Sequence, residues 1–191
     1  MVHLMYLHGF LSSPFSHKAN ETAVWMAEHG YSDYFHCPQI PMEPYEAVTE
    51  IRLAIDKLHG EPVCFIGSSL GGYFATWAVE EFGGKAVLVN PAVHPYVLIN
   101  QYVGAQRNYQ TGEIHQIDAV FGEHLKTFER TISDPERYWL MVQTGDETLD
   151  YREAVQKYAG SAQTVIEGGD HSFQRYGDYL PQIWNFAQGE S

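Results

Sequence analysis

The most constraining feature of this sequence is a short apolar run that leads, without a linker, into a serine flanked by glycines. Residues 63–66 read Val-Cys-Phe-Ile, and residues 67–72 read Gly-Ser-Ser-Leu-Gly-Gly. The apolar run is typical of a strand buried on both faces of a parallel sheet, and the residues that follow predict a helix over 70–82. A G-x-S-x-G pattern between a strand and a helix indicates a sharp turn, with the small residues keeping the two elements from colliding.

Short apolar runs alternate with helical patterns along most of the chain. This alternation is typical of a parallel sheet with helices on both of its faces. The expected strands are 2–7, 34–37, 62–66, 86–89, 138–142 and 163–166. The expected helices are 17–29, 44–59, 70–82, 151–158 and 179–186. The pattern therefore predicts an α/β fold with about six strands.

The stretch 93–137 interrupts this alternation. It lies between two expected strands, is rich in Tyr, Gln, Asn and His, and contains no segment that reads as a strand. A structureless loop of this length is uncommon in a compact domain. We therefore expect two or three helices there, near 96–103 and 117–129, forming a helical cap inserted into a single domain that spans 1–191.

The charge balance excludes several classes of partner. The 191 residues include 24 acidic and 11 basic side chains, for a net charge of −13. Binding to nucleic acid or to an anionic membrane needs a basic patch, which so few scattered basic residues do not provide.

No apolar run approaches the roughly 20 residues that span a bilayer, and the N-terminal residues do not read as a signal peptide. Cys37 and Cys64 lie in apolar runs and are expected to be packing residues, which fits a cytoplasmic location.

Ser69 occupies the central position of the G-x-S-x-G pattern, and its neighbour Ser68 is out of register. A serine hydroxyl becomes an effective nucleophile only when a base takes its proton. In folds with this turn the partners follow along the chain in the order Ser, acid, His. Nine of the ten histidines precede residue 125, so His171 is the candidate base. It follows the expected strand 163–166, which would place it at the sheet edge where the strands end.

Three carboxylates compete for the role of the acid, because all three follow the expected strand 138–142. Asp146 comes directly after the turn glycine and is favoured. Asp150, with Glu153 three residues later, has the pattern of a helix capping box. Glu147 is the third candidate. Asp170 is adjacent to His171, and neighbouring side chains point apart, so it is interpreted as a loop residue.

An enzyme of this kind also needs fixed N–H donors for the negative oxygen that develops during the reaction. The backbone N–H of Leu70, directly after the serine, is one candidate. The N–H of Phe10, in the loop that follows the first strand, is the second, and His8 in the same loop is interpreted as structural. Some of the aromatic residues near these loops are expected to line an acyl pocket, walled by Phe10 and by residues of 93–137; the aromatic candidates are Phe10, Phe15, Tyr73, Tyr96, Tyr102 and Tyr109.

Over nearly its whole length the chain resembles the α/β-hydrolase fold superfamily, and more closely the small YqiA-like bacterial esterases. The stretches that carry the resemblance are Tyr-Leu-His-Gly-Phe at 6–10 with Ser-Ser-Pro at 12–14, Gly-Ser-Ser-Leu-Gly-Gly-Tyr at 67–73, Val-Asn-Pro-Ala at 89–92, Gln-Thr-Gly-Asp-Glu at 143–147 with Leu-Asp-Tyr at 149–151, and Val-Ile-Glu-Gly-Gly at 165–169. In one respect the chain departs from larger relatives, which usually place two residues between the glycine and the aspartate of the acid loop.

The resemblance implies a three-layer sandwich with a trimmed, mostly parallel sheet of about six strands. It also implies a serine hydrolase that acts on small carboxylic esters or thioesters without a cofactor, with a catalytic triad of Ser69, Asp146 and His171. The alternatives are the same fold cleaving a peptide or C–C bond, or a catalytically silent interaction module. A metal enzyme is not expected, because the histidines are scattered without the close spacing of a metal motif.

Overall fold

A six-stranded parallel sheet forms the centre of the computed structural model, which describes residues 1–189. The strand order is β2-β1-β3-β4-β7-β8, and every neighbouring pair is parallel. The strands are β1 (His3–Leu7), β2 (Phe35–His36), β3 (Val63–Ser68), β4 (Lys85–Val89), β7 (Tyr138–Gln143) and β8 (Ala162–Ile166). The expected α/β fold with six strands is confirmed.

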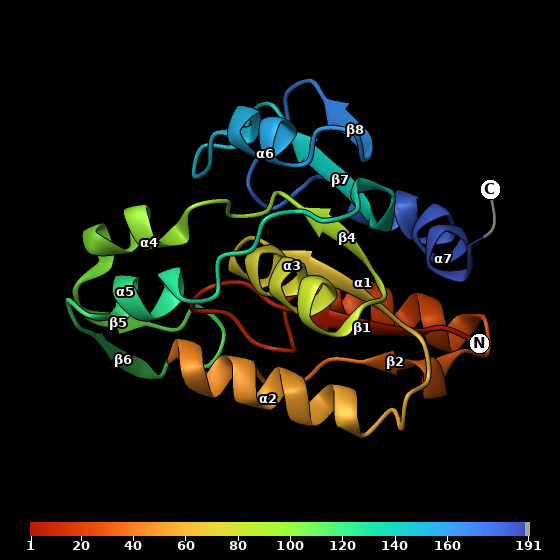
Figure 1. The fold of residues 1–191 in the computed structure, drawn as a ribbon, viewed down its shortest axis with the longest axis horizontal. Coiled ribbons are helices and arrows are strands. Elements are labelled where there is room, and N and C mark those ends of the chain that lie inside the picture. Colours follow the sequence, from red (N-terminus) through yellow and green to blue (C-terminus); the bar gives the residue numbers. More distant parts are fainter. Residues whose placement is uncertain (190–191) are drawn as a thin grey trace.

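Helices cover both faces of this sheet (Figure 1). One face carries α1 (His17–Glu28) and α7 (Leu180–Gln188); the other carries α2 (Pro44–Asp56), α3 (Leu70–Phe82) and α6 (Tyr151–Lys157). The strands alternate between the two cores. In β3, for example, Cys64 and Ile66 belong to the core under α1 and α7, whereas Phe65 belongs to the core under α3. This alternation on a doubly covered sheet explains the uninterrupted apolar run in the sequence and confirms the three-layer sandwich.

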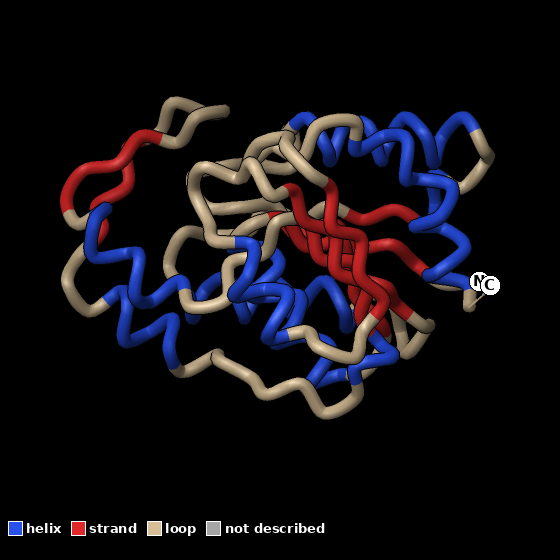
Figure 2. Tube along the Cα trace, turned by 90° about the horizontal axis from the view of Figure 1, so that it is seen from above, coloured by secondary structure: helices blue, strands red, loops and turns tan. Residues whose placement is uncertain are grey.

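The insertion segment, residues 93–137, lies at the end of the sheet opposite to the two chain termini (Figure 1). It contains the short helices α4 (Pro95–Leu98) and α5 (Phe121–Lys126), as expected, together with 3-10 turns. It also contains an antiparallel hairpin, β5 (Gly104–Arg107) and β6 (Ile114–Ile117), which projects from the body of the molecule (Figure 2).

The expectation that this segment contains no strand was therefore wrong, whereas the expected short helices are present. The hairpin escapes sequence analysis because a half-buried strand is recognised by alternation of apolar and polar residues. The burial of β5 and β6 alternates along each strand, but their residues, Gly-Ala-Gln-Arg and Ile-His-Gln-Ile, do not alternate between apolar and polar in step with it. Their pairing is defined by the backbone register, in which Gly104 lies opposite Ile117.

The two cysteines differ in burial. Cys64 is fully buried, as expected, whereas Cys37 is only half-buried. Burial raises the pKa of both thiols to about 12, so each stays protonated at neutral pH. Among the helices of residues 1–189, none combines the length and the apolar character that crossing a lipid bilayer requires.

Candidate active site

Ser69 lies at the junction between β3 and α3, in a strained backbone conformation. Its φ of 55° falls in the left-handed region, which non-glycine residues seldom adopt. The glycines on either side make the junction possible. A Cβ on Gly67 would overlap the carbonyl oxygen of Gly71, and a Cβ on Gly71 would overlap the carbonyl oxygen of Leu7 in β1. The glycine spacing of the sequence pattern thus reflects the close approach of β3, α3 and β1 next to the serine.

We expect Gly71→Ala to lower the free energy of unfolding by about 3 kcal/mol, because the added methyl group must displace the backbone of β1. Gly177→Ala is the matched control, since a Cβ there meets only the end of the flexible Glu21 side chain, at 3.1 Å. Urea unfolding followed by circular dichroism measures both variants. Equal stabilities of the two variants would contradict the packing described for the junction.

The structure brings Ser69, His171 and Asp146 together. His171 Nε2 lies 3.1 Å from Ser69 Oγ, and His171 Nδ1 lies 2.8 Å from Asp146 Oδ2. The three residues follow β3, β8 and β7 respectively, so the carboxyl ends of three parallel strands supply them. Their sequence separations are large, and the parallel sheet brings the loops that carry them to one edge.

Asp146 is held rigidly. Its side chain is only 2% exposed, and its Oδ1 accepts hydrogen bonds from the backbone N–H groups of Thr148 at 2.8 Å and Leu149 at 2.9 Å. An ionised carboxylate only accepts hydrogen bonds, so the proton of the neutral imidazole sits on Nδ1. That tautomer leaves Nε2 of His171 as an acceptor facing the Ser69 hydroxyl.

The other carboxylates near this loop contact different groups. Asp150 caps α6 by accepting from the N–H of Arg152, and hydrogen bonds from Arg152 hold its pKa below the usual range. Glu147 Oε2 accepts from the backbone N–H of His171 at 3.0 Å rather than from the ring. Of the three acids considered from the sequence, Asp146 is therefore the one that contacts the imidazole.

The loop after β1 packs directly against the serine. A Cβ on Gly9 would lie 3.2 Å from Ser69 Cβ, so only glycine allows this approach without displacement. In the part of the chain that the structure describes, neither the N–H of Phe10 nor that of Leu70 donates to a protein acceptor. Leu70 is the first residue of α3, where N–H groups have no partner within the helix. Both candidate donors are thus free to bind another oxygen.

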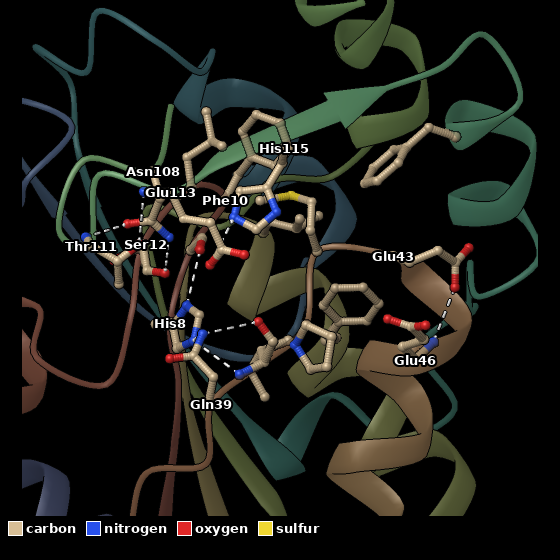
Figure 3. A pocket seen from close by; sticks show the side chains of 18 of the residues that line it. His8, Phe10, Ser12, Gln39, Glu43, Glu46, Asn108, Thr111, Glu113 and His115 are labelled. Atoms are coloured by element: carbon tan, nitrogen blue, oxygen red, sulfur yellow. Dashed lines mark hydrogen bonds and ion pairs between the residues drawn. The ribbon is translucent and has the colours of Figure 1, made fainter. Parts of the chain in front are cut away.

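His8 fixes the orientation of this loop (Figure 3). The ring is 4% exposed; its Nε2 accepts from the N–H of Ile40 at 3.0 Å, and its Nδ1 lies 3.1 Å from the carbonyl oxygen of Gly9. Acceptance at Nε2 places the proton on Nδ1, which donates to Gly9. The N–H of Phe10 belongs to the same trans peptide and points the opposite way. Burial lowers the pKa of His8, which keeps this neutral form. The interpretation of His8 as structural agrees with these contacts.

A cavity of about 770 Å³ opens over Ser69. Three of the six aromatic candidates line it, namely Phe10, Tyr102 and Tyr109. The other three do not: Phe15 is 76% exposed, the hydroxyl of Tyr73 donates to the carbonyl of Leu125, and the hydroxyl of Tyr96 donates to Glu129. The insertion segment thus contributes to this cavity, but with fewer aromatic rings than the sequence suggested.

A second cavity, of about 560 Å³, lies on the other side of Phe10 between the loop after β2 and the hairpin (Figure 3). It shares Gly9, Phe10, Ser12 and Leu70 with the first cavity, and His8 forms part of its wall. Within residues 1–189, no three His, Cys, Asp or Glu side chains gather in a way that could hold a metal ion.

Lys18 is a residue of the site that sequence analysis missed. It lines the first cavity from α1, and its Nζ donates to the backbone carbonyl of Ser172 at 2.7 Å, next to His171. Burial lowers the pKa of Lys18 to about 8. No local pattern marks this lysine, because its partner lies 154 residues further along the chain.

Comparison with protein families gives one match. The model of a family described as "Uncharacterised protein family (UPF0227)" matches residues 3–188. The match covers every strand and helix named above, including the three residues in contact at the site.

Comparison with solved structures gives similar folds at low sequence identity. A candidate hydrolase from Agrobacterium vitis S4 has a TM-score of 0.74 and 18% identity, covering 97% of this chain and 87% of that one. Alpha/beta hydrolase domain-containing protein 10 from mouse has a TM-score of 0.73 and 16% identity, covering 98% and 90%. A monoacylglycerol lipase from Paleococcus ferrophilus has a TM-score of 0.65 and 13% identity, covering 97% and 93%. These likenesses show the α/β-hydrolase fold.

Proposed function

The chain belongs to the UPF0227 family, and from that premise we propose that it is a serine hydrolase that cleaves carboxylic esters or thioesters through an acyl-enzyme on Ser69. The observation that carries the proposal is the hydrogen-bonded series Asp146–His171–Ser69, of which Ser69 and His171 line a cavity. This series has the geometry in which a base activates a serine and an acid orients the base. The candidate hydrolase from Agrobacterium vitis S4 and the monoacylglycerol lipase from Paleococcus ferrophilus share the fold, which is consistent with the proposal.

Acylation begins when Ser69 Oγ attacks the carbonyl carbon of the substrate. A bond forms between them while the hydroxyl proton moves to His171 Nε2, and Asp146 stabilises the resulting imidazolium. The carbonyl oxygen becomes negative and binds the N–H groups of Phe10 and Leu70. Each such donor contributes about 3 kcal/mol to the stabilisation of the transition state. The bond to the leaving oxygen or sulfur then breaks, and the proton on Nε2 passes to the leaving group.

Deacylation repeats these steps with water. His171 Nε2 takes a proton from a water molecule while the water oxygen attacks the acyl carbon. The bond between the acyl carbon and Ser69 Oγ then breaks, the proton on Nε2 passes to Oγ, and the carboxylic acid leaves. All of the proton transfers use side chains of this protein, so the proposed cycle needs no cofactor.

The two walls of the cavity suggest where the acyl chain and the leaving group of the substrate lie. The insertion segment contributes the largely apolar wall, with Leu98 and Tyr102 among its residues. The wall formed by α1 and the loop of His171 is polar and includes Lys18 and Gln174. Because His171 must protonate the leaving group, that group lies at the polar wall and the acyl chain lies under the insertion segment. The insertion segment then acts as the cap of the acyl site.

We expect Leu98→Trp to change the acyl-chain preference. A larger side chain at this wall fills space that a long acyl chain would occupy. The ratio of kcat/KM for p-nitrophenyl octanoate to that for p-nitrophenyl acetate is expected to fall about 10-fold or more. Val97→Trp is the control, since Val97 is its neighbour on α4 but is 61% exposed and does not line the cavity. Equal ratios in the two variants would place the acyl chain elsewhere.

The experiment that tests the proposed function combines turnover with covalent labelling. The wild-type protein is assayed with p-nitrophenyl esters and acyl-thioesters of graded length, and is then treated with a fluorophosphonate probe. Hydrolysis together with a probe adduct on the peptide that contains Ser69 is the expected result. A protein that neither hydrolyses the panel nor takes up the probe is instead a silent interaction module.

A further inference from the structure

The loop that carries His171, residues 170–174, is held to the sheet by two buried amide side chains. Asn90, directly after β4, is one of them. Its Nδ2 donates to the backbone carbonyls of Asp170 at 3.0 Å and of His171 at 3.1 Å. Its Oδ1 accepts from the N–H of Gln143 at 3.0 Å. A single side chain therefore ties the histidine loop to the end of β7.

Gln143, the last residue of β7, is the second amide. Its Oε1 accepts from the N–H of Asp170 at 3.1 Å and from the N–H of Gln174 at 2.9 Å, and its Nε2 donates to the carbonyl of Gln174 at 3.0 Å. The two amides together satisfy five backbone groups on both sides of His171. Such a loop has few backbone groups left over to form alternative hydrogen bonds.

The local backbone is adapted to these contacts. Asn90 is 2% exposed and adopts a φ of 42°, in the left-handed region that asparagine tolerates better than most residues. Gln143 is 3% exposed. A Cβ on Gly169 would overlap the Gln143 amide, so a glycine is required beside it. Buried amides that use most of their donors and acceptors fix one arrangement of the chain, because each broken bond leaves a buried polar group unpaired.

We propose that Asn90 and Gln143 are positioning residues, which act on the reaction by holding the loop so that His171 Nε2 faces Ser69 Oγ. This inference rests on the proposed function, since it assigns them a role in a reaction performed by Ser69 and His171. Neither amide touches the reacting atoms. They set the position of the His171 imidazole between Ser69 and Asp146.

The expected consequence of losing either amide is a slower chemical step, with a smaller effect on substrate binding. Without them the loop gains freedom, and the 3.1 Å contact between His171 and Ser69 is no longer maintained. A displacement of about 1 Å at such a contact lowers the rate about 100-fold. The loop of His171 forms one wall of the cavity, but the apolar wall contributed by the insertion segment keeps its contacts, so we expect kcat to fall far more than KM rises.

Two variants test the inference. Asn90→Gly removes the amide, and its glycine accepts the left-handed backbone without strain. Gln143→Met keeps the length of the side chain but cannot bond to Asp170 or Gln174. Thr76→Val is the control: Thr76 is 2% exposed and bonds to Tyr158 at 2.7 Å, so the substitution also removes a buried hydrogen bond, away from the histidine loop.

Each variant is measured for kcat and KM at a temperature well below its own unfolding transition. The low-field proton resonance of the Nδ1–H of His171, hydrogen-bonded to Asp146, is followed by NMR in the same samples. We expect kcat to fall about 100-fold in Asn90→Gly and Gln143→Met, with the resonance broadened or shifted, and neither change in Thr76→Val.

Wild-type kcat and an unchanged resonance in Asn90→Gly and Gln143→Met would overturn the inference while leaving the proposed function intact. Absence of turnover and of probe labelling in the wild-type protein would instead contradict the proposed function. The resonance still tests the positioning role in that case, because it reports the His171–Asp146 contact without any substrate.

Discussion

Replacing Ser69 by alanine is expected to lower kcat about 10⁶-fold and to abolish labelling by a fluorophosphonate probe. The substitution removes only the hydroxyl group, whose Oγ forms a hydrogen bond with His171 Nε2. Without Oγ no bond to the acyl carbon can form, and His171 has no proton to accept. Alanine keeps the Cβ and the shape of the turn, so we expect the variant to fold as the wild type does.

Ser68→Ala is the matched control for this prediction. Ser68 is the neighbouring serine, the last residue of β3, and is 7% exposed. Its substitution is expected to leave probe labelling intact. Steady-state kinetics with p-nitrophenyl acetate, together with intact-mass measurement after labelling, distinguishes the two serines. Turnover that survives in Ser69→Ala and is lost in Ser68→Ala would reverse the assignment of the nucleophile.

Asp146→Asn is expected to lower kcat about 10⁴-fold with little change in KM. Oδ1 of Asp146 accepts from two backbone N–H groups, and Oδ2 faces His171 Nδ1. An asparagine keeps its oxygen on those two donors and therefore turns its NH₂ group towards Nδ1. The imidazole proton must then move to Nε2, where it points at Ser69 and leaves no base for the hydroxyl.

Asp150→Asn and Glu147→Gln serve as controls for the acid. Asp150 caps α6, and an asparagine caps a helix about as well as an aspartate. Glu147 accepts from the backbone N–H of His171, which the oxygen of a glutamine also does. Both controls are expected to retain activity close to wild type. A loss of kcat in Asp150→Asn that matches the loss in Asp146→Asn would contradict the identification of Asp146 as the acid.

The residues in contact at the site were predictable because parallel strands bring their carboxyl ends to one edge of the sheet. Ser69, Asp146 and His171 each follow a segment that reads as a strand, so locating the strands placed all three at the same edge. The sequence favoured Asp146 over Glu147 and Asp150 because it comes directly after the turn glycine. A local pattern of this kind does not determine which carboxylate reaches the histidine. The structure adds the hydrogen bonds that distinguish these carboxylates.

The insertion segment and the supporting contacts were less predictable for a physical reason. The two strands of the hairpin hold few apolar residues, and these do not follow the alternation of burial, so the sequence carries little hydrophobic periodicity. Asn90 and Gln143 were visible at strand ends, but their role depends on a loop that lies 80 and 27 residues further along the chain. Long-range hydrogen bonds of this kind leave no local pattern in one sequence, and Lys18 was missed for the same reason.

The left-handed backbone of Ser69 has a consequence for directed evolution of this protein. A non-glycine residue in that conformation costs about 1–3 kcal/mol of stability. Ser69→Gly would relieve this strain while removing the hydroxyl, so a selection for heat resistance alone favours an inactive protein. Natural enzymes commonly show this opposition between stability and activity at their functional residues. Libraries built on this chain should therefore be screened for turnover at every round, with position 69 held fixed.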